Sequence, residues 1–553
     1  MESLSPDWEL TNQKYTQKPD CHLQNISKTS QRDNGKVKKG KKKEQNIPYR
    51  HTMPNREKQM TIDRSIGAPL DPYSAFSWDQ IPWSKVEKLV QRLQNRIAKA
   101  IREQKTGKVK ALQRLLTSSF YSKCLAVKKV VQSKGGNTPG VDGVIWRTPN
   151  QKMKAVCLLK RRGYHPQPLK RIYIPKKDGR QRPLSIPTLL DRAQQALWKL
   201  ALEPIAEVWA DINAYGFRIK RSAADAIKQC HIALSQKVSA PWILEGDIEA
   251  CFDQISHPWL MENIPMDKMI LRKFLKAGFM EGQKVMPTTL GTPQGGVISP
   301  VLALMALSGL ERYLRSRFKS RSSSKVNIVA YCDDFIITAA TKEILQNEVV
   351  PMVEKFLQER GLILSHKKTK ITHIKQGFDF LGHHIRRYSC GKVMITPSPE
   401  NRKRLVRNLR QIVKSLKAEK AGTVISSLNP KIRGWCNYFR HVASSKVFTK
   451  IDYHIYHMLA RWAYRRHPNK SKPWALRKYF KSHGGRNWVF MDTAKRNGEE
   501  KKLTLYSASK TLIRRHIKIK GEAHPFDPQF KEYFKRRKKV MNILWSGVND
   551  LAP

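Results

Sequence analysis

The sequence has no long apolar run, no secretory start and no paired cysteines, and each absence excludes a class of protein. The longest apolar stretch, 297–310, is broken by Pro300, Ser308 and Gly309 and is too short to span a bilayer, so we expect a core helix there. The eight cysteines include no CxxC pair, which argues against a zinc ribbon or a disulfide framework. The start, MESLSPDWEL, is unlike a signal or transit peptide. We therefore expect a cytoplasmic protein with no membrane partner.

Acidic residues are scarce. The 553 residues include 44 Asp and Glu against 105 Lys and Arg, so the formal net charge is +61. Such an excess opposes compaction unless a polyanion neutralises it, which makes nucleic acid the leading partner and leaves a basic membrane-surface protein as its rival. The excess is uneven, because residues 401–553 contain 37 basic and 9 acidic residues. The densest basic surface is therefore expected near the C-terminal end.

Composition and periodicity divide the chain into regions. Residues 1–75 are polar and contain KVKKGKKK, which predicts a flexible basic arm; the alternative is a solvated tail without function. From Trp78 to about Ala126 the pattern predicts two helices. Between 145 and 390, short β-rich runs alternate with helical stretches, as in a mixed α+β domain.

A second, helical domain is predicted from residue 398. Ser398 suits an N-cap and Pro399 the first helical position. Two apolar stripes follow at helical spacing and predict the core of a helix bundle. The stripes are Leu405, Leu409, Ile412, Val413 and Leu416, and then Phe448, Ile451, Ile455, Met458, Leu459 and Trp462.

Three acidic side chains stand in apolar, strand-like surroundings. VAYCDDFIIT (329–338) places Asp333 and Asp334 at the tip of a predicted strand, tight turn and strand, and Asp247 ends an apolar strand in WILEGDIEACFD. Mg²⁺ accepts one or two carboxylates and leaves its other positions to water and substrate phosphates. An isolated Asp pair is more often a solvated turn or a helix cap, so the wider context must decide.

That context is an ordered set of motifs that resembles a reverse transcriptase. YCDD is preceded by IYIPKKDGRQRPLSIP (172–187), DIEACFD (247–253) and GTPQGGVISP (291–300). Further motifs are similar to those of bacterial group II intron-encoded proteins: PGVDG, YGFRIKRSAADAI, GLILSHKKTKI, FDFLGHHI and GWCNYFRHV. The resemblance covers about residues 60–540.

The resemblance implies an α+β fold of the right-hand polymerase type. Fingers and palm would occupy 76–395, a helical thumb or maturase domain 396–480, and a small basic DNA-binding region 485–553. It also implies the form of the family that lacks the H-N-H endonuclease domain.

The resemblance assigns a metal centre. Asp247 and Asp333, with Asp334 as a weaker third carboxylate, would be catalytic and would bind two Mg²⁺ ions, and Ile248 would offer its backbone carbonyl to the second ion. Phe252 would act as a steric gate that excludes a 2′-hydroxyl; the alternative is an ordinary core Phe.

Further residues would bind the deoxynucleoside triphosphate substrate. Lys176 and Arg182 flank the KKDG turn of a hairpin that would close over the triphosphate, although a solvated hairpin would be equally basic. Gln294 would line the nucleotide pocket. Lys368 and Lys370 would lie near the primer or the triphosphate, and the sequence does not decide which of them points inward.

The implied function is RNA-directed DNA synthesis together with maturase activity. The protein would bind its parent group II intron RNA, assist splicing and reverse splicing into target DNA, and copy the intron into cDNA. Two alternatives stay open at this point. One is an RNA-binding splicing factor with a vestigial polymerase domain, and the other is a retron, diversity-generating or defence-associated reverse transcriptase.

Overall fold

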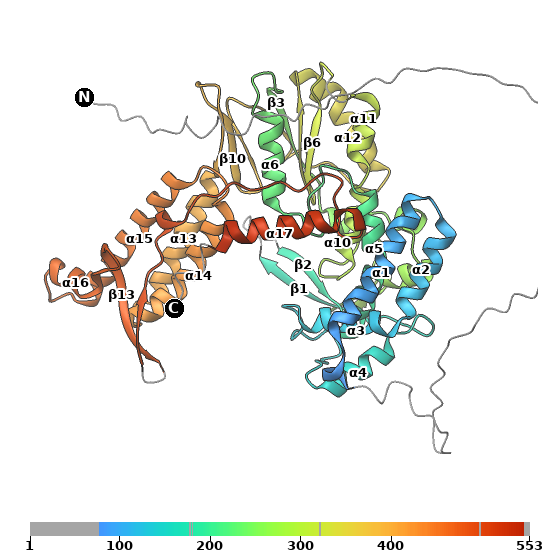
Figure 1. The fold of residues 1–553 in the computed structure, drawn as a ribbon, viewed down its shortest axis with the longest axis horizontal. Helices are drawn as coiled ribbons and strands as arrows, with labels where there is room; N and C mark the ends of the chain where they lie inside the picture. Colours follow the sequence, from blue (N-terminus) through green and yellow to red (C-terminus); the bar gives the residue numbers. More distant parts are fainter. Residues whose placement is uncertain (1–76, 176–178, 180, 320–321, 497–498, 547–553) are drawn as a thin grey trace, which may run out of the picture. The chain divides into compact units, whose positions relative to one another are not determined.

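The computed structural model describes residues 77–546 except 176–178, 180, 320–321 and 497–498 (Figure 1). The predicted arm, 1–75, and the predicted nucleotide-binding residue Lys176 lie outside the described residues. Helices and sheets are mixed along the chain, which confirms the predicted α+β class. The described residues belong to one compact unit.

The N-terminal helices are three where the sequence pattern predicted two. They are α1 (Trp83–Arg102), α2 (Thr106–Ser118) and α3 (Phe120–Val131), and they follow a short 3-10 turn, Trp78–Gln80. The prediction was wrong because helical periodicity continues across two breaks in the backbone. Gln104 has a positive φ of 55°, and Ser119 is extended between α2 and α3. All three helices pack on the long, almost wholly buried helix α5 (Leu189–Trp209).

A small sheet with strand order β2-β1-β4-β5 stands in the predicted fingers. The hairpin β1 (Leu169–Pro175) and β2 (Gln181–Ile186) is antiparallel and pairs with β4 (Phe279–Glu281), which turns back into β5 (Lys284–Met286). Helix α4 (Pro149–Leu158) begins with a capping box at Thr148.

The predicted palm is a four-stranded sheet of order β6-β7-β3-β8. Its strands are β6 (Asn327–Tyr331), β7 (Asp334–Ala339), β3 (Trp242–Asp247) and β8 (Lys370–His373). Both faces are buried, which explains why the strands read as continuous apolar runs. Leu244, Ile328 and Ile337 face the core that contains α5. Ile243 and Ile336 face a second core, shared with α6 (Ala223–Leu234) and the C-terminal helices.

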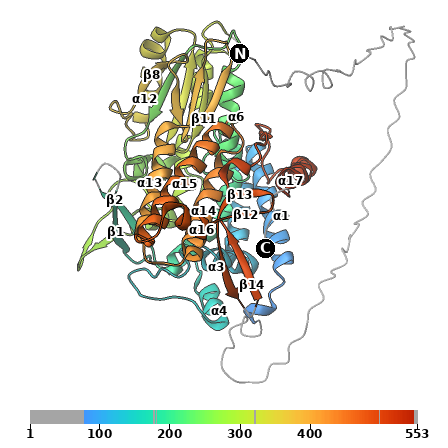
Figure 2. The ribbon, with the colours of Figure 1, turned by 90° about the vertical axis from the view of Figure 1, so that its left-hand side faces the viewer.

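Short helices complete the palm. The apolar stretch 297–310 contains the buried helix α10 (Ser299–Leu307), as predicted. The others are α7 (Cys251–Gln254), α8 (His257–Asn263), α9 (Lys268–Leu275), α11 (Leu310–Arg317), the π-helical turn Ile344–Val349 and α12 (Val350–Gln358). Helix α6 packs on β6 and lies beside β11 (Figures 1 and 2).

Helices occupy the region where the sequence predicted a helical domain. A three-stranded sheet, β9 (Phe378–Phe380), β10 (His383–Arg387) and β11 (Val393–Pro397), leads into it. The helices are α13 (Pro399–Ser415), α14 (Ala421–Phe439), α15 (Ser445–Arg466) and α16 (Lys472–Tyr479). The Ser398 hydroxyl accepts from the N–H of Asn401, so it is the N-cap that the sequence predicted. Both predicted stripes line the core of this bundle.

The remaining chain returns to the palm. A sheet of β12 (Phe480–His483), β13 (Arg486–Arg496) and β14 (Glu499–Thr504) is followed by an extended segment, 508–530, which we call the C-terminal strap, and by α17 (Lys531–Ser546). The strap contacts α14 through Arg514 N–H and Arg440 C=O, 2.8 Å apart. It ends near α1, where Asp527 lies 2.7 Å from Arg102. Part of the predicted DNA-binding region therefore contacts other segments of the same chain.

A row of buried and half-buried histidines joins the bundle to the strap. The ring of His383 lies 5.2 Å from that of His441, and His441 lies 6.1 Å from His516, whose Nε2 is 2.8 Å from Asp225 Oδ1. Burial lowers the pKa of His383 to about 3 and that of His441 to about 4, and the charge of the neighbouring histidine lowers each further. Both imidazoles are therefore neutral at pH 7.

This row predicts acid sensitivity. An unfolded chain binds protons on these histidines near their ordinary pKa of 6.5, whereas the folded chain does not until the pH approaches 4. The free energy of unfolding should therefore fall as the pH is lowered through this window, by up to about 1.4 kcal/mol per pH unit for each histidine. Urea midpoints at pH 7.5, 6 and 5 measure the slope. His441→Gln should flatten it, and the exposed His454→Gln should not; equal slopes in both variants would contradict the prediction.

Candidate active site

The tip of the β6–β7 hairpin carries the two adjacent aspartates. Tyr331 and Asp334 are paired across the hairpin, so Cys332 and Asp333 form a two-residue turn. Only Cys332 has a positive φ, 59°, the pattern of a type II′ turn. The turn lets Asp333 leave the strand direction, so that it and Asp334 can serve the same site, as the sequence predicted.

Asp247 lies directly beside this tip. It is the last residue of β3, and the antiparallel register pairs it with Asp334 of β7. Directly opposed residues in an antiparallel pair have Cβ atoms about 4.5–5.5 Å apart. The structure therefore brings together three carboxylates from positions 247, 333 and 334, although 86 positions separate the first from the second.

Burial and mutual repulsion disfavour the charges of these acids. Burial raises the pKa of Asp333, and the charge of Asp247 raises it further. Burial and the two neighbouring carboxylates raise the pKa of Asp334 to about 6. The ammonium of Lys368 donates to Asp247 Oδ2 at 2.7 Å. The carboxylates thus repel one another even though a lysine already lies against one of them.

The donor set suits a hard divalent cation. Mg²⁺ prefers carboxylate oxygens and completes its shell with water and phosphate, so an all-protein cage is not required. Among the described residues, no group of three His, Cys, Asp or Glu side chains is arranged to hold an ion by itself. Asp247, Asp333 and Asp334 could therefore hold a cation only together with water or substrate oxygens, and Lys368 lies against the Asp247 oxygen that such a cation would use.

Backbone contacts hold the end of β3 in place. Asp247 C=O accepts from Ser365 N–H at 2.8 Å, and Glu249 N–H donates to Ile363 C=O at 2.9 Å. Ile248 lies between them in a bridge to Leu364, and its side chain is buried. The only group that Ile248 could offer to an ion is its backbone carbonyl, and the role that the resemblance implies for it stays a prediction.

Phe252 lies just beyond, on α7. Its half-buried ring packs edge-to-face on Phe217, with centroids 5.6 Å apart, and its carbonyl accepts from Thr292 N–H at 2.6 Å. A Cβ on Gly291 would lie 2.6 Å from that same carbonyl oxygen. The glycine-containing loop therefore packs tightly under Phe252 and limits how far it can move.

Gln294 connects this loop to both neighbouring elements. Its Nε2 donates to Asp253 Oδ2 at 2.7 Å, and its carbonyl accepts from Ser185 N–H of β2 at 2.7 Å. Gly295 has a φ of 116°, and a Cβ there would lie 2.6 Å from Ser185 C=O. The loop thus lies between the predicted fingers and the palm.

The predicted basic residues separate into two groups. The charge of Arg182 on β2 lowers the pKa of Asp333, as does that of Lys368, so both cations face the acid cluster. Lys370 is exposed on β8, opposite Glu245; burial raises the pKa of Glu245, and the charge of Lys370 offsets part of that rise. Of the two lysines that the sequence could not distinguish, Lys368 is the one that contacts an aspartate.

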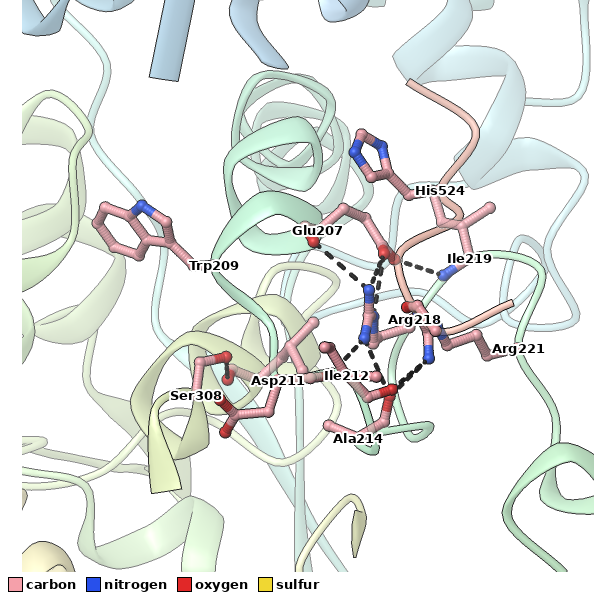
Figure 3. A network of polar contacts seen from close by, with 12 residues as sticks. Glu207, Trp209, Asp211, Ile212, Ala214, Arg218, Ile219, Arg221, Ser308 and His524 are labelled. Atoms are coloured by element: carbon pink, nitrogen blue, oxygen red, sulfur yellow. Dashed lines mark hydrogen bonds and ion pairs between the residues drawn. The ribbon is translucent and has the colours of Figure 1, made fainter. Parts of the chain in front are cut away.

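A buried polar network that sequence reasoning missed lies at the end of α5 and in the chain that follows it (Figure 3). The Arg218 guanidinium donates twice to Glu207 Oε2, at 2.8 and 3.0 Å, and also to the carbonyls of Asp211 and Ala214. Arg221 donates to Ile212 C=O at 2.9 Å. These bonds shape the chain before Tyr215. The motif YGFRIKR contains both arginines, but its charge pattern does not distinguish arginines that bind backbone carbonyls inside the protein from arginines that face solvent.

The segment shaped by this network pairs with β6. Tyr215 N–H donates to Ala330 C=O at 2.9 Å, and Ala330 N–H donates to Asn213 C=O at 3.0 Å. The next residue, Gly216, packs against the hairpin tip, since a Cβ there would lie 2.1 Å from Cys332 N and 2.5 Å from its sulfur. The tip that carries Asp333 thus rests on a glycine.

Comparison with known families follows the same division of the chain. Residues 78–159 match the N-terminal domain of reverse transcriptase, 174–385 match reverse transcriptase (RNA-dependent DNA polymerase), and 402–480 match the group II intron maturase-specific domain. Protein YkfC of Escherichia coli is 33% identical over 343 residues, covering 54% of this chain and 89% of its own. The group II intron-encoded protein LtrA of Lactococcus lactis is 28% identical over 431 residues, 60% of this chain and 70% of its own.

The chain belongs to the group II intron-encoded reverse transcriptases. It is a reverse transcriptase that also carries a splicing maturase domain, as the motifs predicted. The maturase match decides against the retron and defence-associated alternatives, and the right-hand α+β fold is confirmed.

Two further observations complete the comparison. A telomerase chain from Candida albicans, solved with a fragment of telomeric RNA, aligns with a TM-score of 0.33 and 15% identity over 56% of this reverse transcriptase and 63% of that chain. This weak likeness adds nothing to the assignment. Within the part of the chain that the structure describes, no helix has the length and apolar character needed to cross a membrane.

Proposed function

We propose that Asp247, Asp333 and Asp334 hold two Mg²⁺ ions during transfer of a deoxynucleotide to a primer. A reverse transcriptase uses a divalent metal and deoxynucleoside triphosphates, and the observation that carries the residue assignment is the register pairing of Asp247 with Asp334. When bound, the ions would stabilise charge on the attacking primer 3′-oxygen and on the leaving pyrophosphate. The carbonyl of Ile248 would serve as an additional oxygen ligand.

The protein's own cations would guide the triphosphate. Arg182 and Lys368 face the aspartates, and each would move or turn toward the phosphates as negative charge develops there. Lys368 would exchange its contact with Asp247 for one with substrate. Lys176, by resemblance, would act beside Arg182, while Lys370, opposite Glu245, would act along the primer.

Phe252 and Gln294 would form the nucleotide pocket. The ring of Phe252, supported by Phe217 and by the tight loop at Gly291, would lie under the sugar and exclude a 2′-hydroxyl. Gln294, held by Asp253, would line the side of the pocket. Both roles agree with the packing around these residues.

Phe252→Ala is the sharpest test of this pocket. On an RNA template with a DNA primer and Mg²⁺, the wild type should extend with dNTPs and hardly with rNTPs, and EDTA should stop synthesis. Removing the ring should raise ribonucleotide use relative to deoxynucleotide use by about 10–100-fold, the range by which a shaped pocket rejects one added hydroxyl. The ratio of the two kcat/KM values is the measurement.

A matched control is Phe120→Ala, which removes a half-buried ring from α3, outside the site. It should leave the ratio unchanged. An unaltered ratio in Phe252→Ala would remove Phe252 from the pocket, and synthesis that persists in EDTA would contradict the metal assignment.

We further propose that the polymerase works in a complex with its parent intron RNA in a bacterial cytoplasm, and that target DNA is the second partner. The maturase match at 402–480 and the bacterial relatives support this. The net charge of +61 would neutralise RNA phosphates, while the RNA itself would carry the splicing chemistry. The protein would then assist reverse splicing into DNA and copy the intron into cDNA.

A further inference from the structure

A cavity of about 260 Å³ lies where the palm, the thumb and the C-terminal strap meet, and it shares no residue with the candidate active site. One wall is the exposed side of α6, another is β11, and the third is the turn after α14. The strap closes it. The lining residues are Ile227, Lys228, His231, Val393, Met394, Ile395, His441, Val442, Ala443, Ile513, Arg515 and His516.

The polar part of this cavity is entirely basic. Lys228, His231 and Arg515 gather at it, and no acidic residue is among the lining residues. Burial lowers the pKa of Lys228 and of His231, and the charge of Arg515 lowers both further. Two cations and an imidazole that is neutral at pH 7 are thus held close together with no acid among the lining residues, the arrangement expected where an anion binds.

The carboxylate of Asp225, on the same helix as Lys228, does not relieve this charge. Asp225 lies behind His516, and its Oδ1 already accepts from His516, from Ile519 N–H and from Arg537, at 2.8, 2.8 and 3.0 Å. In the part of the chain that the structure describes, neither Lys228 nor Arg515 lies within ion-pair distance of an acid. Their charges remain available to a ligand.

Apolar side chains stand exposed beside these cations. Ile232, Met394, Leu512 and Ile513 are 48%, 43%, 58% and 41% exposed, and they come from α6, β11 and the strap. The floor of the cavity is the buried Ile227 and Ile395. A surface with cations on one side and an apolar slot on the other matches a nucleotide, whose phosphate is anionic and whose base has an apolar face.

We propose that this cavity binds an unpaired nucleotide of RNA, with its phosphate between Lys228 and Arg515 and its base against Ile513 and Val393. The inference rests on the proposed binding of intron RNA and gives it a location. RNA is favoured over a protein partner because the wall after α14 belongs to the segment that matches the maturase domain, and because the cavity contains no hydrogen-bonding acid for a basic peptide. The base slot requires a nucleotide that is free to leave a helix.

The strap also couples RNA binding to its own docking on the palm. Arg515 and Ile513 come from the strap, whereas Lys228 comes from α6, so the cavity exists only while the strap is docked. A bound nucleotide therefore stabilises the docked strap by mass action. RNA binding and the contacts of His516 and Arg537 with Asp225 are coupled in this way.

The test uses the full-length protein with Lys228→Ala and Arg515→Ala combined. Binding of a fluorescent single-stranded 20-nucleotide RNA of mixed sequence is measured by anisotropy from 50 to 300 mM salt. The variant should lose the contribution of two phosphate contacts, so the slope of log Kd against log salt should fall by about 1.4. Lys342→Ala with Lys355→Ala, two exposed lysines elsewhere on the palm, removes the same charge and should leave the slope nearly unchanged.

A crosslink locates the base. The same RNA with 4-thiouridine at single positions should crosslink on irradiation to the peptide that contains 513–516. Ile513→Ser should weaken that crosslink severalfold while keeping the wild-type salt slope, which separates the base slot from the phosphate contacts. Melting temperatures within a few degrees of the wild type show that each variant is folded.

The outcomes are distinguishable. If the Lys228/Arg515 double variant keeps the wild-type salt slope and the wild-type crosslink, the cavity is not the binding site. RNA binding by another part of the protein would still stand. If the double variant loses as much affinity for a single-stranded DNA of the same sequence as it loses for the RNA, the assignment of the ligand as RNA is overturned. If the wild type binds neither this RNA nor a folded intron RNA, the proposed RNA partner fails and the inference fails with it.

Discussion

Asp333→Ala is expected to reduce primer extension on an RNA template by roughly 10³-fold or more while leaving RNA affinity unchanged. Loss of one preorganised electrostatic group at a reacting phosphate or oxyanion typically costs 10²–10³, and a metal ligand shared by two ions should cost at least as much. Asp247→Ala should behave alike, because the register places that residue beside Asp334. Single-turnover rates on a preformed primer–template complex are the measurement.

The stability of Asp333→Ala should move in the opposite direction. Burial and neighbouring carboxylates raise the pKa of Asp333 and Asp334, so each charge costs folding free energy at neutral pH. Removing one acid relieves this cost, and the melting temperature of metal-free Asp333→Ala should equal or exceed that of the wild type. A parallel loss of activity and stability would mean that the residue is structural.

A control acid is Asp79, exposed on the first short turn, and Asp79→Ala should keep full activity. If Asp333→Ala extends primers at the wild-type rate, the carboxylate of Asp333 takes no part in catalysis. Absence of synthesis by the wild type on several RNA templates, with intron binding retained, would support the splicing factor with a vestigial polymerase domain.

Outside the acid cluster, Gly216→Ala is expected to lower the polymerase rate more than any other substitution that adds a single methyl group. Its Cβ would lie 2.1 Å from the backbone nitrogen of Cys332, which is held in the turn that carries Asp333. Overpacking of this kind costs about 1–3 kcal/mol. A displacement of the tip by about 1 Å should lower the rate by about 100-fold.

The chain offers a matched control for this prediction. Gly434 lies in α14 with nothing within 4 Å of its would-be Cβ, so Gly434→Ala should be neutral or stabilising by up to about 1 kcal/mol. Cys332→Gly in the Gly216→Ala background removes the sulfur contact at 2.5 Å but keeps the backbone contact, so activity should recover only in part. Full activity of Gly216→Ala would show that the hairpin tip can move without consequence.

Local patterns predicted much of the architecture. The stripe at Leu405 and Leu409 became the buried face of α13, and Ser398 became its cap, because helical periodicity and capping depend on residues a few positions apart. The prediction of two N-terminal helices was wrong for the converse reason, since a single positive φ at Gln104 and an extended Ser119 interrupt a pattern that continues in sequence.

The site shows the same limit. Lys368 and Lys370 are two positions apart in a basic run, and periodicity cannot say which meets an acid; the register of β8 with β3 places Lys370 opposite Glu245 and leaves Lys368 to reach Asp247. The return of the strap from the thumb to α1 likewise depends on buried partners such as Asp225 that lie some 290 positions away.

The sequence by itself determined the family and predicted a polyanionic partner and three acidic site positions, because the order of short motifs and the net charge are properties of the chain alone. Only the tertiary structure decided that Asp247 faces the hairpin tip, that Gly216 supports it, and that the strap encloses a basic cavity with α6. These are contacts between distant segments, and burial and strand register, which no local pattern encodes, are what bring them together.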